Sequence, residues 1–274
     1  MAPIRRLAII ASAAALFLVS GCSAASAPPN DAPASQNPAV ETPAAADELS
    51  GDLTIFAAAS LTASFTQLAD VFMAQHPGVT IPPITFDGSS TLVTQLTEGA
   101  PADVFASADQ ANMTRADKAG MLAVPATDFA SNTMAIAVQP GNPKNITSLA
   151  DLVAPGLQVV LCAPEVPCGA VANTLLTDDG VNLTPVSEEQ NVKAVVTKVQ
   201  LGEADAGLVY TTDVRAADGA IDGVPIASAE KAANSYPIAV LANAPNPTVA
   251  NAFVQFALSA EAQQILAGYG FGKP

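Results

Sequence analysis

The stretch FAAASL, from Phe56 to Leu61, joins a run of apolar residues to a segment with helical spacing. Residues Leu53 to Ala58 predict a buried strand, because they form a short, mainly apolar and β-prone run. Residues Thr62 to Gln75 place large apolar side chains three and four positions apart, which is the period of a helix. Ser60 therefore lies at the junction, where we expect it to cap the start of the helix.

This alternation of strand and helix continues through the chain. It predicts an α/β fold in which helices cover parallel sheets. A turn rich in Pro and Gly, Gln139 to Pro143, follows a strand at Thr133 to Val138, and the pattern then starts again. We therefore expect two α/β lobes of similar size. The strands expected in the second part are Leu157 to Cys162, Ala206 to Tyr210, Val224 to Ala227 and Pro237 to Ala242.

The N-terminal residues have the pattern of an export signal. Arg5 and Arg6 precede an apolar run from Leu7 to Val19, which is shorter than the ~20 residues that a membrane-crossing helix needs. Residues 20–22, Ser-Gly-Cys, resemble a bacterial lipobox. We expect residues 1–21 to be a lipoprotein signal peptide and Cys22 to be lipidated, with a plain cleaved signal as the alternative. The protein would then be anchored to the outer face of the cytoplasmic membrane.

Residues 22–51 are mostly Ala, Pro, Ser, Asn and Asp, a composition that cannot bury enough apolar surface to fold, so they predict a disordered tether. Loss of the two signal arginines takes the formal net charge from −15 to −17. So acidic a chain is not a nucleic-acid binder. An anionic ligand remains possible, because backbone and hydroxyl dipoles act locally while surface charge is screened.

Two cysteines remain downstream, Cys162 and Cys168. In an exported protein an even pair favours a disulfide, which here would close a short loop, and two reduced thiols are the alternative. A metal site is not expected, because no histidine is near them in sequence and their spacing matches no zinc motif.

Small or hydroxyl-bearing residues recur where strands give way to helices. FDGSSTL, from Phe86 to Leu92, repeats the arrangement at Ser60 and places Ser89 between a strand and a helix. VPCGA, from Val166 to Ala170, brings a small residue and a glycine to another helix start, and Val192 begins a further helix. Four helix N-termini, two from each lobe, would bind an anion without a cationic side chain.

These segments resemble the periplasmic molybdate-binding proteins of ABC transporters. The resemblance extends from Leu53 to Gly272, and it is carried by FAAASLT, FDGSSTL, GAPADVFASAD (Gly99 to Asp109), VPCG, GLVYTTD (Gly207 to Asp213), YPIAV (Tyr236 to Val240) and YGF (Tyr269 to Phe271). It implies the type II periplasmic binding protein fold, with two α/β lobes joined by two crossover segments. Lobe I would comprise residues 52–132 and 237–274, and lobe II residues 133–236.

The resemblance also implies a ligand set. Ser60 and Ser89 would offer hydroxyl and backbone N–H groups to the oxyanion, Cys168 and Val192 their backbone N–H groups, and Tyr210 its hydroxyl. The family commonly has a small residue such as alanine where this chain has Cys168. A disulfide to Cys162 would stiffen that wall of the pocket.

Molybdate and tungstate only accept hydrogen bonds, so a cavity lined by uncharged donors would satisfy them. A carboxylate facing the ligand would repel it, unless the ligand carried a proton as hydrogen phosphate does. We expect no cofactor, no directly coordinated metal, a monomer, and delivery of the ligand to an ABC permease.

Two alternatives remain open from the residues. One is a receptor of the same fold for another oxyanion, such as sulfate or a phosphonate. The other is a serine hydrolase, but such an enzyme needs a base beside its serine. His76 is the only histidine, and neither Ser60 nor Ser89 lies in a G-x-S-x-G motif.

Overall fold

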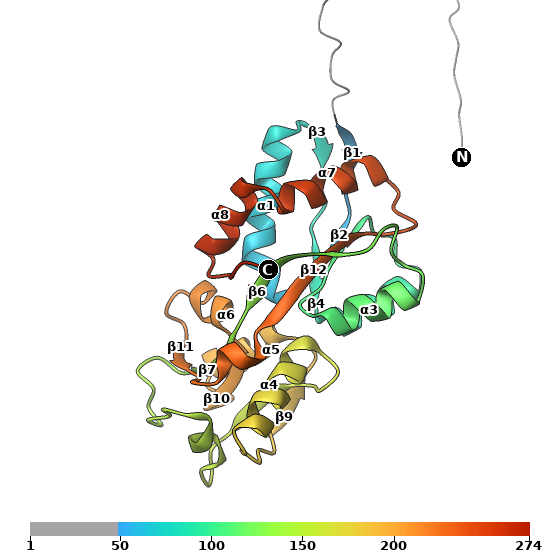
Figure 1. The fold of residues 1–274 in the computed structure, drawn as a ribbon. Helices are drawn as coiled ribbons and strands as arrows, with labels where there is room; N and C mark the ends of the chain where they lie inside the picture. Colours follow the sequence, from blue (N-terminus) through green and yellow to red (C-terminus); the bar gives the residue numbers. More distant parts are fainter. Residues whose placement is uncertain (1–48) are drawn as a thin grey trace, which may run out of the picture. The chain divides into compact units, whose positions relative to one another are not determined.

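The structure, a computed structural model, describes residues 49–274 (Figure 1). The predicted signal peptide, the lipidation site at Cys22 and nearly all of the predicted tether lie outside the described residues. In the described part, no helix combines the length and the apolar character needed to cross a membrane. Two five-stranded sheets form the body of this part. A separate two-stranded parallel sheet is formed by β1 (Ser50–Asp52) and β3 (Gly78–Thr80).

The first sheet contains strands from both ends of the described chain. Its order is β4 (Thr85–Asp87), β2 (Ile55–Ala58), β5 (Val104–Ala106), β12 (Asn234–Val240) and β6 (Thr127–Asn132). The β4, β2 and β5 strands are parallel, whereas β12 is antiparallel to both β5 and β6. The C-terminal strand is thus inserted between two strands from the first half of the chain.

Successive side chains of these strands enter different cores, as the two-residue period of a strand requires. Ile55 and Ala57 pack in a cluster with α1 (Thr62–Gln75), α7 (Pro247–Ala257) and α8 (Ala260–Gly268). Phe56, between them, packs in a separate cluster with α2 (Ser89–Thr97) and α3 (Gln110–Lys118). Helices therefore cover both faces of the sheet, which explains why the inner strands β2 and β5 are apolar along their whole length.

The second sheet is built entirely from the middle of the chain. Its order is β11 (Asp222–Pro225), β7 (Met134–Val138), β10 (Ala206–Tyr210), β8 (Val159–Cys162) and β9 (Ser187–Glu189). One large core joins this sheet to α4 (Pro167–Asp178) and α5 (Val192–Gln200). Shorter segments complete this half: α6 (Thr211–Ala216), η2 (Leu149–Val153) and η3 (Ala229–Ala232).

Two adjacent strands connect the halves. The chain leaves the first sheet along β6 and returns along β12, and Asn132 is paired with Asn234 across them. Figure 1 shows these strands, in green and orange, running side by side between the two halves. Because one strand leaves and the other returns, they must run in opposite directions. The expectation of parallel sheets is therefore wrong in part: each sheet is mixed, since β7 is also antiparallel to β10 and β11.

Several predicted boundaries differ by a few residues from the structure. The strand expected from Leu53 begins at Ile55, and the one expected at Val224 to Ala227 is Asp222–Pro225. Within VPCGA, helix α4 begins at Pro167, because proline suits the first turn, where a helix needs no backbone donor.

Aromatic side chains hold α1 and α7 together. Phe253 is completely buried, and its ring lies 5.3 Å from that of Phe72 and 6.1 Å from that of Phe65, measured between centroids. We expect Phe253→Ala to lower the free energy of unfolding by about 3 to 5 kcal/mol, through lost burial and a residual cavity. Val124→Ala is the control, because Val124 is 53% exposed and should change stability by less than about 0.5 kcal/mol. Equal effects of the two variants in denaturant unfolding would contradict this assignment of the core.

Candidate functional site

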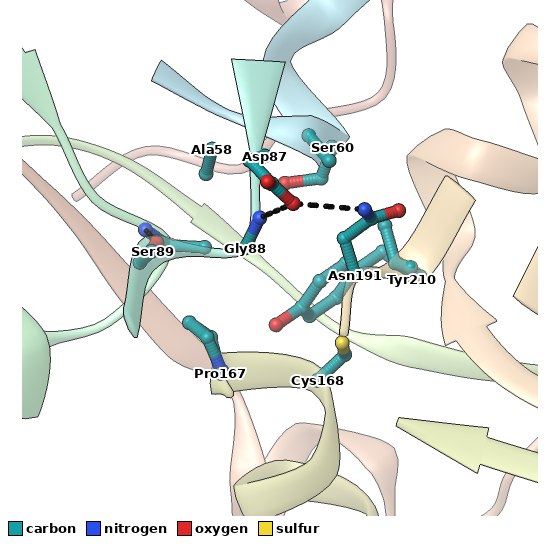
Figure 2. Close-up of a pocket in the computed structure, with 12 residues that line it drawn as sticks. Ala58, Ser60, Asp87, Gly88, Ser89, Pro167, Cys168, Asn191 and Tyr210 are labelled. Carbon is teal, nitrogen blue, oxygen red and sulfur yellow. Dashed lines mark hydrogen bonds between the residues drawn. The ribbon is translucent and has the colours of Figure 1, made fainter. Parts of the chain in front are cut away.

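A small pocket lies where helix starts from both sheets meet (Figure 2). All five residues predicted to bind a ligand line it: Ser60, Ser89, Cys168, Val192 and Tyr210. The other lining residues are Ala58, Ala59, Asp87, Gly88, Ala108, Pro167 and Asn191. Among the described residues, no lysine or arginine lines this pocket.

Ser60 lies inside a turn of 3-10 helix, η1 (Ala59–Leu61), that precedes α1. The residue at the N-cap position is Ala58, so the prediction that Ser60 caps the helix is wrong. The reason is that the helical path begins one turn earlier than the apolar spacing indicates. The buried hydroxyl of Ser60 instead lies 3.0 Å from the hydroxyl of Tyr236.

Ser89 is the first residue of α2 and is completely buried, and Gly88 occupies the N-cap position. The Oγ atom of Ser89 accepts a hydrogen bond of 3.0 Å from the backbone N–H of Ala108. Because that N–H can only donate, the proton of the Ser89 hydroxyl remains available to a group in the pocket.

Cys168 and Val192 lie in the first turns of α4 and α5. The first N–H groups of a helix have no acceptor within it, and together they carry a partial positive charge. Asn191 caps α5 by accepting from the N–H of Ala194 at 3.0 Å. A disulfide links Cys168 to Cys162 at the end of β8, so a covalent bond ties the start of α4 to the adjacent strand.

Tyr210 ends β10, and its ring is buried beside the pocket. The carboxylate of Asp213 accepts from the backbone N–H of Tyr210 at 3.2 Å and forms an ion pair of 2.8 Å with Lys193. Burial raises the pKa of the Asp213 carboxyl, and Lys193 opposes that rise. Burial also raises the pKa of the Tyr210 hydroxyl well above its ordinary value, so this hydroxyl keeps its proton and can donate.

Asp87 corrects the expectation of a pocket lined only by uncharged groups, because its carboxylate belongs to the lining. As Figure 2 shows, its Oδ1 accepts from the N–H of Gly88 at 2.7 Å and from Nδ2 of Asn191 at 2.9 Å. Two donors therefore offset part of the charge, and one of them comes from the opposite half of the molecule. The FDGSSTL motif contained Asp87, but its sequence pattern does not reveal which way the carboxylate points.

Gly88 lies at a close approach between the two halves. A Cβ atom at this position would lie 2.2 Å from the carbonyl oxygen of Gln190 and 3.3 Å from a methyl group of Val166. The pocket can close to this extent only because residue 88 has no side chain. Gly88 is part of the FDGSSTL motif, but no local pattern reveals this contact, which joins segments about a hundred residues apart in the chain.

The model of a family described as "Bacterial extracellular solute-binding protein" matches residues 53–272. This chain belongs to that family. The chain is 46% identical over 238 residues to the molybdate-binding protein ModA of Mycobacterium tuberculosis, covering 87% of this chain and 91% of the relative. The periplasmic molybdate-binding protein of Azotobacter vinelandii superposes with a TM-score of 0.68 at 20% identity, covering 81% of this chain and 99% of that one. The sulfate-binding protein SubI of M. tuberculosis superposes with a TM-score of 0.67 at 20% identity, covering 80% and 86%.

These similarities confirm the predicted relationship to periplasmic molybdate-binding proteins and the predicted fold. Proteins of this family bind solutes outside the cytoplasm and are not enzymes, which rules out the serine hydrolase alternative. The two superpositions are almost equally good, so the fold by itself does not choose between molybdate and sulfate.

Gly88→Ala tests how tightly the halves approach each other. The backbone of Gly88, with φ −58° and ψ 137°, suits alanine, so the variant should fold and unfold like the natural protein. The added methyl group should nevertheless separate the halves and increase the radius of gyration measured by small-angle X-ray scattering. Gly268→Ala is the control, because nothing lies within 4 Å of a Cβ atom there. An unchanged radius of gyration for Gly88→Ala would mean that the contact with Gln190 does not limit closure.

Proposed function

We propose that this protein captures molybdate, and tungstate, outside the cytoplasmic membrane and delivers it to an ABC permease. The observation that carries the proposal is the convergence of helix starts from both halves on one pocket that lacks lysine and arginine. Such a site offers N–H and O–H donors, which complement an oxyanion that only accepts hydrogen bonds. The 46% identity to a molybdate-binding relative supports the choice of oxyanion.

Each of the five residues has a role in this proposal. Ser60 and Ser89 donate from their hydroxyl and backbone N–H groups, and Tyr210 donates from its hydroxyl. Cys168 and Val192 donate from the backbone, so the disulfide at Cys168 leaves its donor free. The ligand carries its own metal atom and is bound through its oxygens, so we propose no cofactor and no metal coordinated by side chains.

We propose further that the lobes comprise residues 52–132 with 237–274, and residues 133–236. An oxyanion held by the helix starts of one lobe attracts those of the other, so binding favours the closed arrangement through differential affinity. The two connecting strands, β6 and β12, are where rotation between the lobes would occur. The closed receptor would then dock on the permease as a monomer.

Export and anchoring form a separate part of the proposal. A cleaved signal of residues 1–21 and a lipid on Cys22 would hold the receptor at the outer face of the cytoplasmic membrane. The predicted tether, residues 22–51, would end before Ser50, because Ser50 and Gly51 belong to β1. Mass spectrometry of the mature N-terminus distinguishes a lipidated Cys22 from a plain cleaved signal.

A thermal-unfolding titration with molybdate, tungstate, sulfate and phosphate tests the ligand. We expect strong, concentration-dependent stabilisation by the first two only, because a ligand that binds only the native state raises its stability. Calorimetry should show that Ser60→Ala weakens molybdate binding by about 1 to 3 kcal/mol, since a charged acceptor loses a donor. Ser64→Ala is the matched control, because the Ser64 hydroxyl is buried one turn further along, in α1, but donates to the Leu61 carbonyl.

The outcomes separate the alternatives. Equal stabilisation by sulfate would replace the proposal with a general oxyanion receptor. If Ser60→Ala, like the control Ser64→Ala, binds molybdate as tightly as the natural protein, Ser60 is not part of the site.

Asp87→Asn tests whether the ligand carries a proton. Molybdate is fully ionised, so loss of the nearby carboxylate should tighten its binding by about 1 kcal/mol, the scale of a partly screened charge pair. Asparagine keeps an oxygen that can accept from Gly88 and Asn191. A protonated oxyanion would instead use the carboxylate as an acceptor, and its binding would weaken in the variant. Weaker molybdate binding by Asp87→Asn in calorimetry is therefore the result that contradicts the proposed site.

A further inference from the structure

The strands that connect the two halves carry a group of polar side chains next to the pocket. Asn132 ends β6, and Asn234 and Tyr236 belong to β12, where Asn132 and Asn234 are directly paired. Tyr236 is completely buried and Asn132 is nearly so. None of the three lines the pocket, yet Tyr236 contacts Ser60 and Asn234 contacts Tyr210.

The orientation of the Asn132 amide is fixed by the backbone. Its Oδ1 accepts from the N–H of Thr133 at 3.0 Å, and a backbone N–H can only donate. Its Nδ2 must therefore point the other way, where it donates to Thr212 Oγ1 at 2.8 Å and to the Tyr236 hydroxyl at 3.3 Å. Asn132 thus supplies a donor to Tyr236 and cannot accept its proton.

This arrangement determines the direction of the hydrogen bond between Tyr236 and Ser60. Their oxygens are 3.0 Å apart, and either hydroxyl is chemically able to donate. If Ser60 donated, the proton of Tyr236 would face only amide donors, those of Asn132 and Asn234, and would be left buried without an acceptor, which is costly. Tyr236 therefore donates to Ser60. The proton of Ser60 is then free to point into the pocket that Ser60 lines.

Asn234 acts on Tyr210 in the same way. Its Nδ2 contacts the carbonyl oxygen of Ala108, which can only accept, and also donates to the Tyr210 hydroxyl at 3.2 Å. Within the described residues the Oδ1 of Asn234 has no partner, but turning the amide over would set that oxygen against the Ala108 carbonyl. The Tyr210 hydroxyl hence accepts from Asn234, and its own proton is free for the pocket.

We infer that Tyr236 and Asn234 are positioning residues, which orient the hydroxyl protons of Ser60 and Tyr210 toward the ligand. The inference rests on the proposed function and deepens it, because oriented protons select a ligand whose oxygens only accept. Both residues lie on β12, so a strand that joins the halves also sets the direction of the hydroxyl protons in the site. Rotation about this strand would change the same hydrogen bonds.

Tyr236→Phe removes one hydroxyl and keeps the ring, which packs 5.4 Å from the Phe271 ring and 6.3 Å from the Phe129 ring between centroids. We expect molybdate to bind this variant about 3- to 10-fold more weakly, because the Ser60 proton loses its fixed direction. In a double-mutant cycle, adding Tyr236→Phe to Ser60→Ala should cause no further loss, since Tyr236 acts through Ser60. Tyr269→Phe, on a tyrosine that lies outside this network, is the control.

Asn234→Ala provides a second, independent cycle. Its effect on molybdate affinity should disappear when Tyr210 is already replaced by phenylalanine. Unfolding of the ligand-free variants is measured in parallel, because a merely structural role would lower stability and weaken binding equally in both backgrounds.

Two results would overturn this inference but leave the proposed function standing. In the first, Tyr236→Phe binds molybdate as tightly as the natural protein. In the second, the losses of affinity from Tyr236→Phe and Ser60→Ala multiply as independent effects. Absence of any oxyanion binding by the natural protein would instead overturn the proposed function, and this inference with it.

Discussion

The structure depends on one constraint: donors that lie far apart in the sequence must reach a single small volume without a cationic side chain. The fold meets it by ending β2, β4 and β10 at the pocket and by starting α4 and α5 beside it. Every such start presents N–H groups that the helix cannot pair internally. Because the donors come from two sheets, neither half of the molecule contains the complete site.

Asp87 shows how closely charge is balanced in this pocket. The chain is strongly acidic, but charges on the surface are screened by salt over about 10 Å, whereas a half-buried carboxylate in the lining is screened less. The donors from Gly88 and Asn191 face that carboxylate. The same contact joins the two halves, so the group that opposes an anion also contributes to closure.

The hydroxyl groups need more than proximity, because a hydroxyl can point its proton in several directions. Two asparagines, each fixed by a backbone group, remove that freedom for Tyr236 and Tyr210. These asparagines lie opposite each other on β6 and β12. The polar side chains on these two connecting strands therefore orient hydroxyl protons at the pocket, in addition to lying where the halves are joined.

The sequence by itself determined the α/β class and the division into two α/β units, and its small residues at helix starts pointed to Ser60, Ser89 and Cys168. The complete set of five pocket residues came from the family resemblance. These features are local: a strand period, a helix period and the residue types at their junction can be read in a short window. Tertiary structure alone decided the reversed direction of β12, the carboxylate of Asp87 in the lining, and the approach of Gly88 to Gln190. It also brought Tyr236 to Ser60, 176 positions away in the chain. The reason is physical, since the direction of a returning strand and the proton direction of a buried hydroxyl depend on partners that no local pattern encodes.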